Sequence, residues 1–157
     1  MIDINNESGQ AVDEKGLVKL ARFAMRALHI HRDAELSIVL LDEQTMASYH
    51  ERYMGEPGPT DVLSFPMDEL RPGQSDADAP QGVLGDIVLC PGVIARQADD
   101  AGRSFDFEAN YLLIHGLLHL LGFDHAEPAE KAVMFGLNDQ IIAAWDKHRN
   151  EPANASR

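Results

Sequence analysis

Residues 111–121 constrain the fold of this chain more than any other segment, because they are almost wholly apolar and yet carry two histidines four positions apart. Positions four apart lie one turn above the other on the same face of a helix. Gly122 follows, and glycine commonly ends a helix because it accepts a left-handed backbone. The next turn can bring a third histidine back to the same point. The side chains expected to converge are His115, His119 and His125.

Three neutral imidazoles with room for one water are typical of an open zinc site. The alternative is a buried helix whose histidines bond to carbonyl groups, and a lone histidine would favour that interpretation. Two histidines on one face, a glycine turn and a third histidine favour the metal. We therefore expect one zinc ion per chain, with His115, His119 and His125 as both its ligands and the catalytic centre.

The length of 157 residues and an apolar fraction of 45% favour one domain with a substantial core. We expect this domain over residues 1–149 and a disordered tail over 150–157. The formal net charge of −13 argues against nonspecific nucleic-acid binding, and no DNA partner is expected. The single Cys90 cannot form an internal disulfide, which fits a reducing cytoplasm. No signal peptide and no membrane span are recognised.

The remaining pattern predicts an α+β fold, with a small mixed β-sheet packed with about five helices. Strands are expected at 2–5, 35–42, 61–65 and 85–90, and helices at 11–28, 43–53, 92–101, 106–121 and 127–147. Strand 35–42 is mostly apolar, so both of its faces are expected to be buried. Residues 66–83 are rich in Pro, Gly, Asp and Ser and predict a mobile hairpin loop between two strands.

Residues 11–28 predict an amphipathic helix with a basic stripe. Its apolar positions follow the helical core spacing, at Leu17, Leu20, Ala21, Ala24 and Leu28. The opposite side carries four cations, Lys15, Lys19, Arg22 and Arg26. Two interpretations remain open: an ordinary solvated helix face, or a track for the phosphates of RNA.

The histidine spacing resembles that of the metzincin zinc proteases, whose motif is HExxHxxGxxH. In those proteases, the glutamate after the first histidine is the general base. Here Gly116 occupies that position, so the sequence does not support peptide hydrolysis by that route. A carboxylate at position 116 is expected to face a bound phosphate, so Gly116→Glu should bring no gain in RNA cleavage.

Three blocks together resemble the bacterial YbeY family of endoribonucleases and rRNA maturation factors. His115-Gly-Leu-Leu-His-Leu-Leu-Gly-Phe-Asp-His125 is similar to its HGxLHLxGYDH signature. Pro59-Thr-Asp-Val-Leu-Ser-Phe-Pro66 resembles its PTDVLSFP block, and Leu84-Gly-Asp-Ile-Val-Leu89 its GDI strand. The resemblance covers about residues 35–146, and Leu70-Arg-Pro-Gly-Gln resembles the actinobacterial branch.

This resemblance implies a zincin-like fold with His115, His119 and His125 as the zinc ligands. It also implies a zinc-dependent endoribonuclease of single-stranded RNA. Its role would be maturation of the small-subunit rRNA 3′ end and ribosome quality control, with ribosomal RNA and the small subunit as partners. An alternative is a ribosome-assembly factor with a structural metal and little nuclease activity. A third is a hydrolase of a peptide or small molecule.

Further residues are assigned weaker roles. Many family members carry an arginine where this chain has Met54, and Arg52, two positions earlier, could engage RNA in its place. Asp61, Asp86 and Asp124 are the candidates for a general base. Asp124 adjoins a ligand and is expected to orient an imidazole. Asp61 and Ser64 are expected to support the site from a strand, and Asp86 is expected to be structural.

Overall fold

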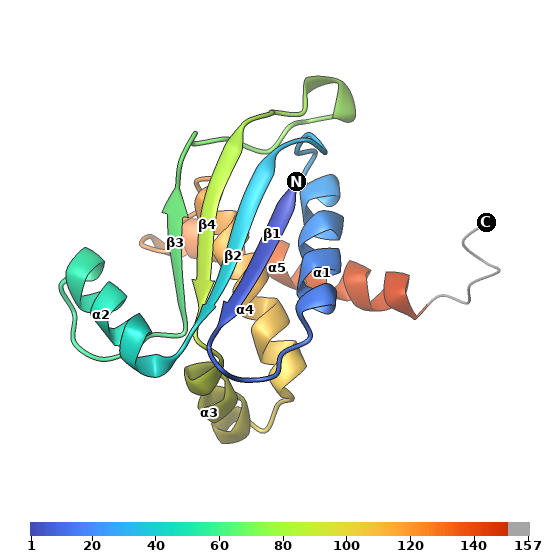
Figure 1. Ribbon diagram of the computed structural model, residues 1–157. Helices are drawn as coiled ribbons and strands as arrows, with labels where there is room; N and C mark the ends of the chain where they lie inside the picture. The colour runs from blue at the N-terminus through green and yellow to red at the C-terminus, as the bar shows by residue number, and fades with distance from the viewer. Residues whose placement is uncertain (151–157) are drawn as a thin grey trace.

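The computed structural model describes residues 1–150, which form one four-stranded mixed sheet and five α-helices (Figure 1). The predicted α+β class is therefore confirmed. The elements in chain order are β1 (Ile2–Glu7), α1 (Glu14–Ala27), β2 (Glu35–Leu41), α2 (Glu43–Met54), β3 (Val62–Pro66), the 3₁₀ helix η1 (Asp76–Asp78), β4 (Val83–Leu89), α3 (Pro91–Ala101), α4 (Phe105–Leu120) and α5 (Pro128–Arg149). Of the predicted tail over residues 150–157, residues 151–157 lie outside the described part of the chain. A single domain over 1–149 stays a prediction.

The sheet has the strand order β1-β2-β4-β3. Strands β1, β2 and β4 run parallel to one another, and β3 pairs antiparallel with β4 as the predicted hairpin. The register places Ile4 beside Ile38 and Ile38 beside Ile87. This row of β-branched side chains points into the main core, where Ile38 and Ile87 have no exposed surface. Mobility of the hairpin loop stays a prediction.

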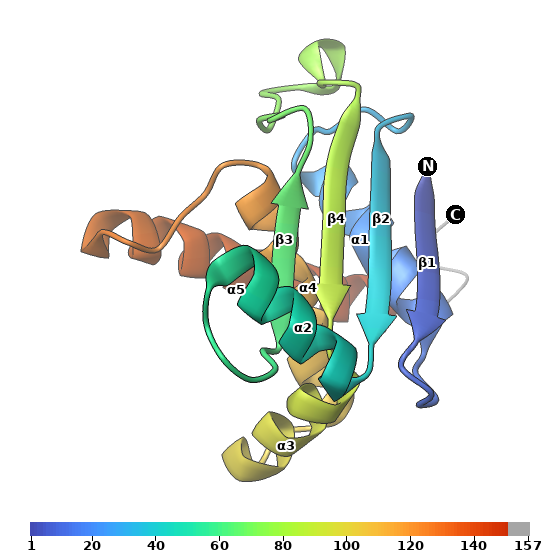
Figure 2. The same ribbon diagram turned by 60° about the vertical axis from the view of Figure 1, so that its left-hand side comes forward.

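Helices α1 and α4 pack on one face of the sheet, α5 packs on α1 and α4, and α2 crosses the other face (Figure 2). Helix α4 lies between the sheet and α5 and also contacts α1 and α3, which explains why it is apolar on almost every side. The smaller core beneath α2 contains Leu41, Met46, Leu63 and Cys90. Because α2 covers only part of its face, much of that face of the sheet stays open.

Strand β2 corrects one prediction. Its burial alternates over most of its length, since Leu36, Ile38 and Leu40 are buried while Ser37 and Val39 are only half-buried. Both faces are buried only at the end of the strand, where Leu41 joins the core beneath α2. The prediction that both faces of β2 are buried is therefore wrong for most of the strand, although its sequence is mostly apolar.

The helix boundaries follow from their caps. Helix α2 begins at residue 43 as predicted, because the Asp42 carboxylate accepts the Thr45 N–H at 2.7 Å. Helix α1 begins at residue 14 and not at residue 11, because the Asp13 carboxylate accepts the Gly16 N–H at 3.0 Å. Within residues 1–150, no helix combines the length and the apolarity needed to cross a bilayer.

Candidate metal centre

Helix α4 and the turn that follows it bring the three predicted histidines together. His115 and His119 lie one turn apart on α4, with ring centroids 4.7 Å from each other. The helix ends in a left-handed turn, in which Gly122 has a φ of 93° and the Phe123 N–H donates to the Leu118 carbonyl at 3.0 Å. This reversal returns His125, whose ring centroid lies 5.5 Å from that of His115 and 5.1 Å from that of His119.

The donor atoms of the three histidines fit a shared metal ion. One ring nitrogen from each lies within 4.8 Å of the other two. Zinc bonds to nitrogen are about 2.1 Å long, so two nitrogens on one ion lie at most about 4.2 Å apart. Small side-chain rotations therefore suffice to bring all three to one ion. Three imidazoles are a donor set that suits zinc and leaves a coordination position open.

Burial keeps His115 and His119 in the neutral form that binds metals. Desolvation, with smaller contributions from His119 and His125, lowers the pKa of His115 from 6.5 to about 4, while Asp61 raises it. Desolvation and the neighbouring His125 also lower the pKa of His119. Asp124 and a hydrogen bond with the Phe123 backbone act on the His119 pKa in the opposite direction. Protons thus compete weakly for these two nitrogens at neutral pH.

The metal-free protein should lose stability as the pH falls from 6.5 towards 4. In that window the unfolded chain protonates His115 and the folded chain does not, so protons favour unfolding. Urea unfolding at pH 7 and pH 5 should show a larger drop for the wild type than for His115→Asn, which cannot take the proton. Equal drops in the two proteins would contradict the lowered pKa.

The predicted supporting residues lie around this centre in different ways. The Asp124 carboxylate accepts the backbone N–H of His125 at 2.7 Å, so it holds the turn that carries the third histidine. Asp61 accepts the Val62 N–H at 2.7 Å, and its charge acts on His115. Ser64 donates to the Gly116 carbonyl at 3.1 Å, which ties β3 to α4.

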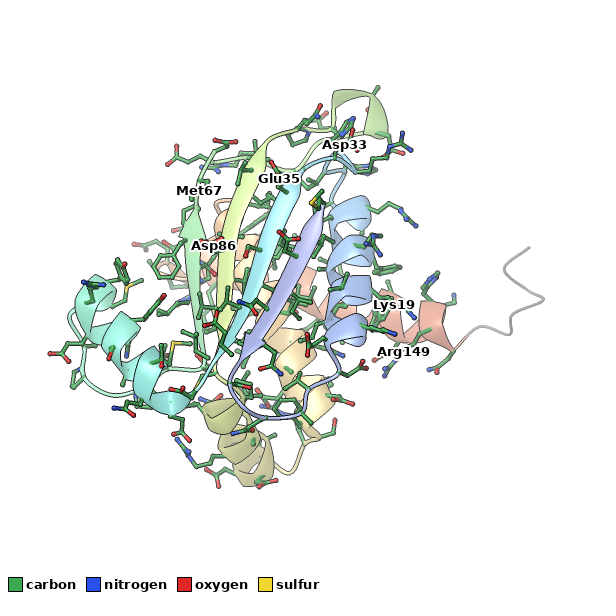
Figure 3. All side chains as sticks on the ribbon, viewed as in Figure 1. Lys19, Asp33, Glu35, Met67, Asp86 and Arg149 are labelled. Carbon is green, nitrogen blue, oxygen red and sulfur yellow. The ribbon has the colours of Figure 1, made fainter. Side chains whose placement is uncertain are left out.

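Gly116 faces the sheet, so the prediction that this position faces a bound phosphate is wrong. A Cβ placed on it would lie 2.8 Å from Ile87 Cγ2 and 3.1 Å from Ser64 Oγ. Helix α4 can approach β3 and β4 this closely because position 116 has no side chain. Asp86 neighbours Ile87 in β4, and strand alternation turns it to the opposite face of the sheet (Figure 3).

The basic residues predicted from the sequence lie away from the histidines along the chain and on other elements. Arg52 is in the last turn of α2, with its guanidinium carbon 6.0 Å from the centre of the Tyr53 ring. The α1 stripe is exposed as expected, at Lys15, Lys19, Arg22 and Arg26. A role in RNA binding stays a prediction for all five residues.

Three neighbours of the histidines were not singled out as site residues. A Cβ on Gly122 would lie 2.5 Å from the guanidinium carbon of Arg71, so this side chain from the β3–β4 loop rests on the metal-site turn. The Phe135 ring lies 6.1 Å from His115 and 6.3 Å from His125, and Lys131 Nζ lies 5.5 Å from the Phe135 ring. Spacing in the sequence could not reveal Arg71, which is more than forty residues from the nearest of the three histidines.

Comparison with known proteins agrees with the histidine signature. The family model described as "Endoribonuclease YbeY" matches residues 3–146. Endoribonuclease YbeY of Cutibacterium acnes is 68% identical, over 96% of this chain and 97% of its own length. The corresponding Thermobifida fusca protein is 54% identical with the same coverage. The solution structure of TM1509 from Thermotoga maritima shares the fold, with a TM-score of 0.65 and 24% identity over 98% of this chain and 95% of that one. The chain therefore belongs to the endoribonuclease YbeY family.

Proposed function

We propose that this protein is a zinc-dependent endoribonuclease of single-stranded RNA. The convergence of His115, His119 and His125 carries the proposal, because three imidazoles suit zinc with an open position. The relatives at 68% and 54% identity are named endoribonucleases. The proposed substrate is ribosomal RNA, at the 3′ end of the small-subunit rRNA, and the proposed setting is ribosome quality control in the cytoplasm, with the small subunit as partner.

The roles of the protein's own groups follow from their positions. The three histidines would hold the ion, which when bound supplies an activated water and offsets negative charge on a phosphate oxygen. The Asp124 contact with the His125 backbone fixes the turn that presents the third ligand. Asp61 and Asp124 remain candidate proton acceptors, because both act on the pKa values of the ligands. Asp86 is removed from the candidates because it faces the other side of the sheet.

Two cations beside the histidines are suited to receive the substrate's phosphates. The Arg71 Nη1 donates to the carbonyls of Glu69 at 3.1 Å and Leu70 at 3.0 Å, which holds its guanidinium against Gly122. Lys131 is held over Phe135, whose ring flanks two of the ligands. Guanidinium binds phosphate with two parallel hydrogen bonds, so Arg71 is the stronger candidate.

Replacing Arg71 with glutamine should lower kcat/KM for RNA cleavage about ten- to a hundredfold. A hydrogen bond to a charged group contributes about 1.5–3 kcal/mol, and about 1.4 kcal/mol corresponds to a factor of ten. Zinc content and the unfolding midpoint should change little, because Arg71 lies on an exposed loop. Lys147→Gln, an exposed cation near the end of α5, is the control. A rate for Arg71→Gln within twofold of the wild type would remove Arg71 from the site.

The test of the proposed function is metal-dependent cleavage at a defined position. Metal-free protein, and the same protein with one equivalent of zinc restored, would be incubated with a precursor RNA that contains the small-subunit 3′ end. We expect cleavage only with zinc, at one mapped position. Stoichiometric zinc binding without cleavage would overturn the proposal in favour of an assembly factor with a structural metal.

A further inference from the structure

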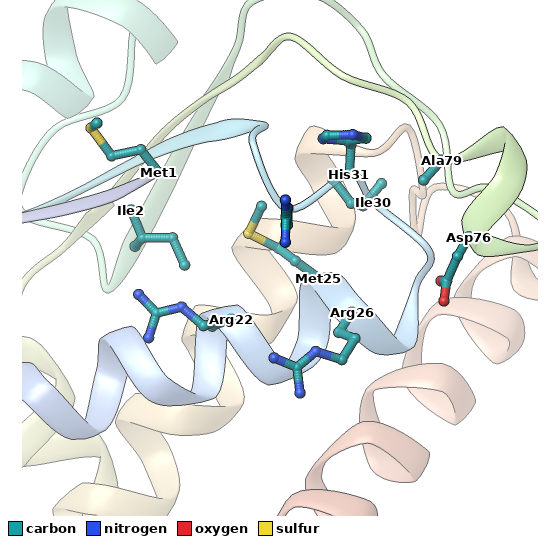
Figure 4. Close-up of a pocket in the computed structure, with 10 residues that line it drawn as sticks. Met1, Ile2, Arg22, Met25, Arg26, Ile30, His31, Asp76 and Ala79 are labelled. Carbon is teal, nitrogen blue, oxygen red and sulfur yellow. The ribbon is translucent and has the colours of Figure 1, made fainter.

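A cavity of about 430 Å³ lies between the start of β1, the second half of α1 and the β3–β4 loop (Figure 4). Its volume is within the range of small-molecule sites. None of the three histidines of the metal centre lines it. The lining residues are Met1, Ile2, Arg22, Met25, Arg26, Ile30, His31, Arg32, Asp76 and Ala79.

Three arginines gather at this cavity although the chain as a whole is strongly acidic. Arg22 and Arg26 are four residues apart on α1, so their like charges lie side by side at a small cost to the helix. Within the described part of the chain, none of the three arginines forms a hydrogen bond or an ion pair with an acidic side chain. The one acid in the lining, Asp76, already bonds to His29 Nδ1 at 3.0 Å. The cluster therefore lacks the anion that would neutralise it.

The rest of the lining adds an apolar surface and a neutral donor. Met25 and Ile30 are 5% exposed each and belong to the main core, so they form a fixed apolar wall. His31 Nδ1 accepts the Asp33 N–H at 3.0 Å, which makes Nε2 the N–H donor of the neutral ring. An apolar wall beside guanidiniums suits an unstacked base, and the guanidiniums suit its phosphate.

The same loop connects this cavity with the metal centre. Arg71 rests on Gly122 of the metal-site turn, and Asp76 and Ala79 of the same loop line the cavity. Five residue steps separate Arg71 from Asp76, which limits their Cα separation to about 18 Å. The His31 N–H donates to the Pro80 carbonyl at 3.0 Å and fixes the loop over the cavity. One single strand of RNA could therefore reach both places.

We propose that this cavity is a nucleotide-binding subsite that holds a phosphate on Arg22, Arg26 and Arg32 and the attached base against Met25 and Ile30. The inference rests on the proposed function in so far as the nucleotide belongs to the RNA bound at the metal centre. Free mononucleotides share this chemistry and are the second possible source. The other two cations of the α1 stripe, Lys15 and Lys19, lie outside the cavity.

The test uses the zinc-loaded full-length protein, with adenosine 5′-monophosphate as the probe and calorimetry or NMR titration as the readout. We expect the wild type to bind the nucleotide, and to bind adenosine, which lacks the phosphate, at least tenfold more weakly. The double variant Arg26→Gln, Arg32→Gln should bind the nucleotide with an affinity at least tenfold lower than that of the wild type. The control Lys147→Gln, Arg149→Gln removes the same charge from exposed positions near the end of α5. Its affinity should stay within twofold of the wild type.

Two further arms identify the source and separate this inference from the proposed function. A 5′-phosphorylated oligoribonucleotide that binds more tightly than the mononucleotide identifies an RNA strand end, and equal affinity identifies the free nucleotide. His119→Ala should still bind the mononucleotide, so the subsite survives a failure of the metal proposal. Three results would overturn the subsite. The first is no binding of the mononucleotide by the wild type, and the second is wild-type affinity in the arginine double variant. The third is a loss of affinity in the double variant Lys15→Gln, Lys19→Gln as large as that in the arginine variant.

Discussion

Replacing His119 with alanine is expected to remove stoichiometric zinc and RNA cleavage together. The variant leaves two histidine ligands where three converge. It should also lower the unfolding temperature in the presence of zinc, because a metal that binds only the folded state stabilises that state, by about 4 kcal/mol at a thousand times its dissociation constant. Elemental analysis, cleavage assays and thermal unfolding with and without zinc measure the three effects.

Two companion variants separate the loss of a ligand from misfolding. His125→Ala removes the third ligand from an exposed turn, so it should keep the fold and still lose zinc. His148→Ala removes an α5 histidine that packs against Phe23 of α1 and Trp145 of α5, so it should keep one zinc per chain. One zinc per chain in His119→Ala would refute the three-histidine centre.

Replacing Gly116 with glutamate is expected to destabilise the protein by several kcal/mol and to give no gain in RNA cleavage. Even its Cβ meets Ile87 Cγ2 at 2.8 Å, and the rest of the side chain would place a carboxylate between α4 and the sheet. Overpacking of a core costs about 1–3 kcal/mol, and a buried unpaired charge costs more. Urea unfolding of the metal-free variant measures the effect apart from zinc binding.

Gly136 offers a matched control for this substitution. It is also a helical glycine, in α5, but a Cβ placed there meets no atom within 4 Å. Gly136→Ala should therefore stabilise the protein by up to about 1 kcal/mol through helix propensity alone. The free energy of unfolding of Gly116→Ala should be lower than that of Gly136→Ala, because the Cβ at position 116 meets Ile87. Wild-type stability in Gly116→Glu would contradict the close packing of α4 on the hairpin.

The sequence predicted the convergence of the three histidines because their geometry is local. The helix period, the glycine turn and the return of the chain act within eleven residues, from His115 to His125. The caps of α2 and α4 are local in the same way, as the bonds of Asp42 and Ser104 to N–H groups three residues ahead show. Local rules of this kind depend on few residues at a time.

Features that join distant segments could not be read from the pattern. The surroundings of Gly116 depend on how the β3–β4 hairpin packs on α4, and the side chains involved lie 29 and 52 residues earlier. For the same reason, the sequence pattern did not reveal that Arg71 lies beside Gly122. The half-open face of β2 was missed because an apolar run does not reveal whether one helix or a full layer covers it.

The short span of the three histidines has a consequence for how the proposed activity would be lost. All three histidines belong to one helix and the turn after it, whereas Arg71 belongs to the β3–β4 loop. Segments of a folded protein open separately, and exposed loops open at the lowest free energy. In the proposed zinc-bound protein, we therefore expect the hairpin loop to detach on warming while α4 still holds the ion. We expect such a protein to be fully metallated yet unable to cleave RNA, in which case zinc content would be a poor measure of the active fraction.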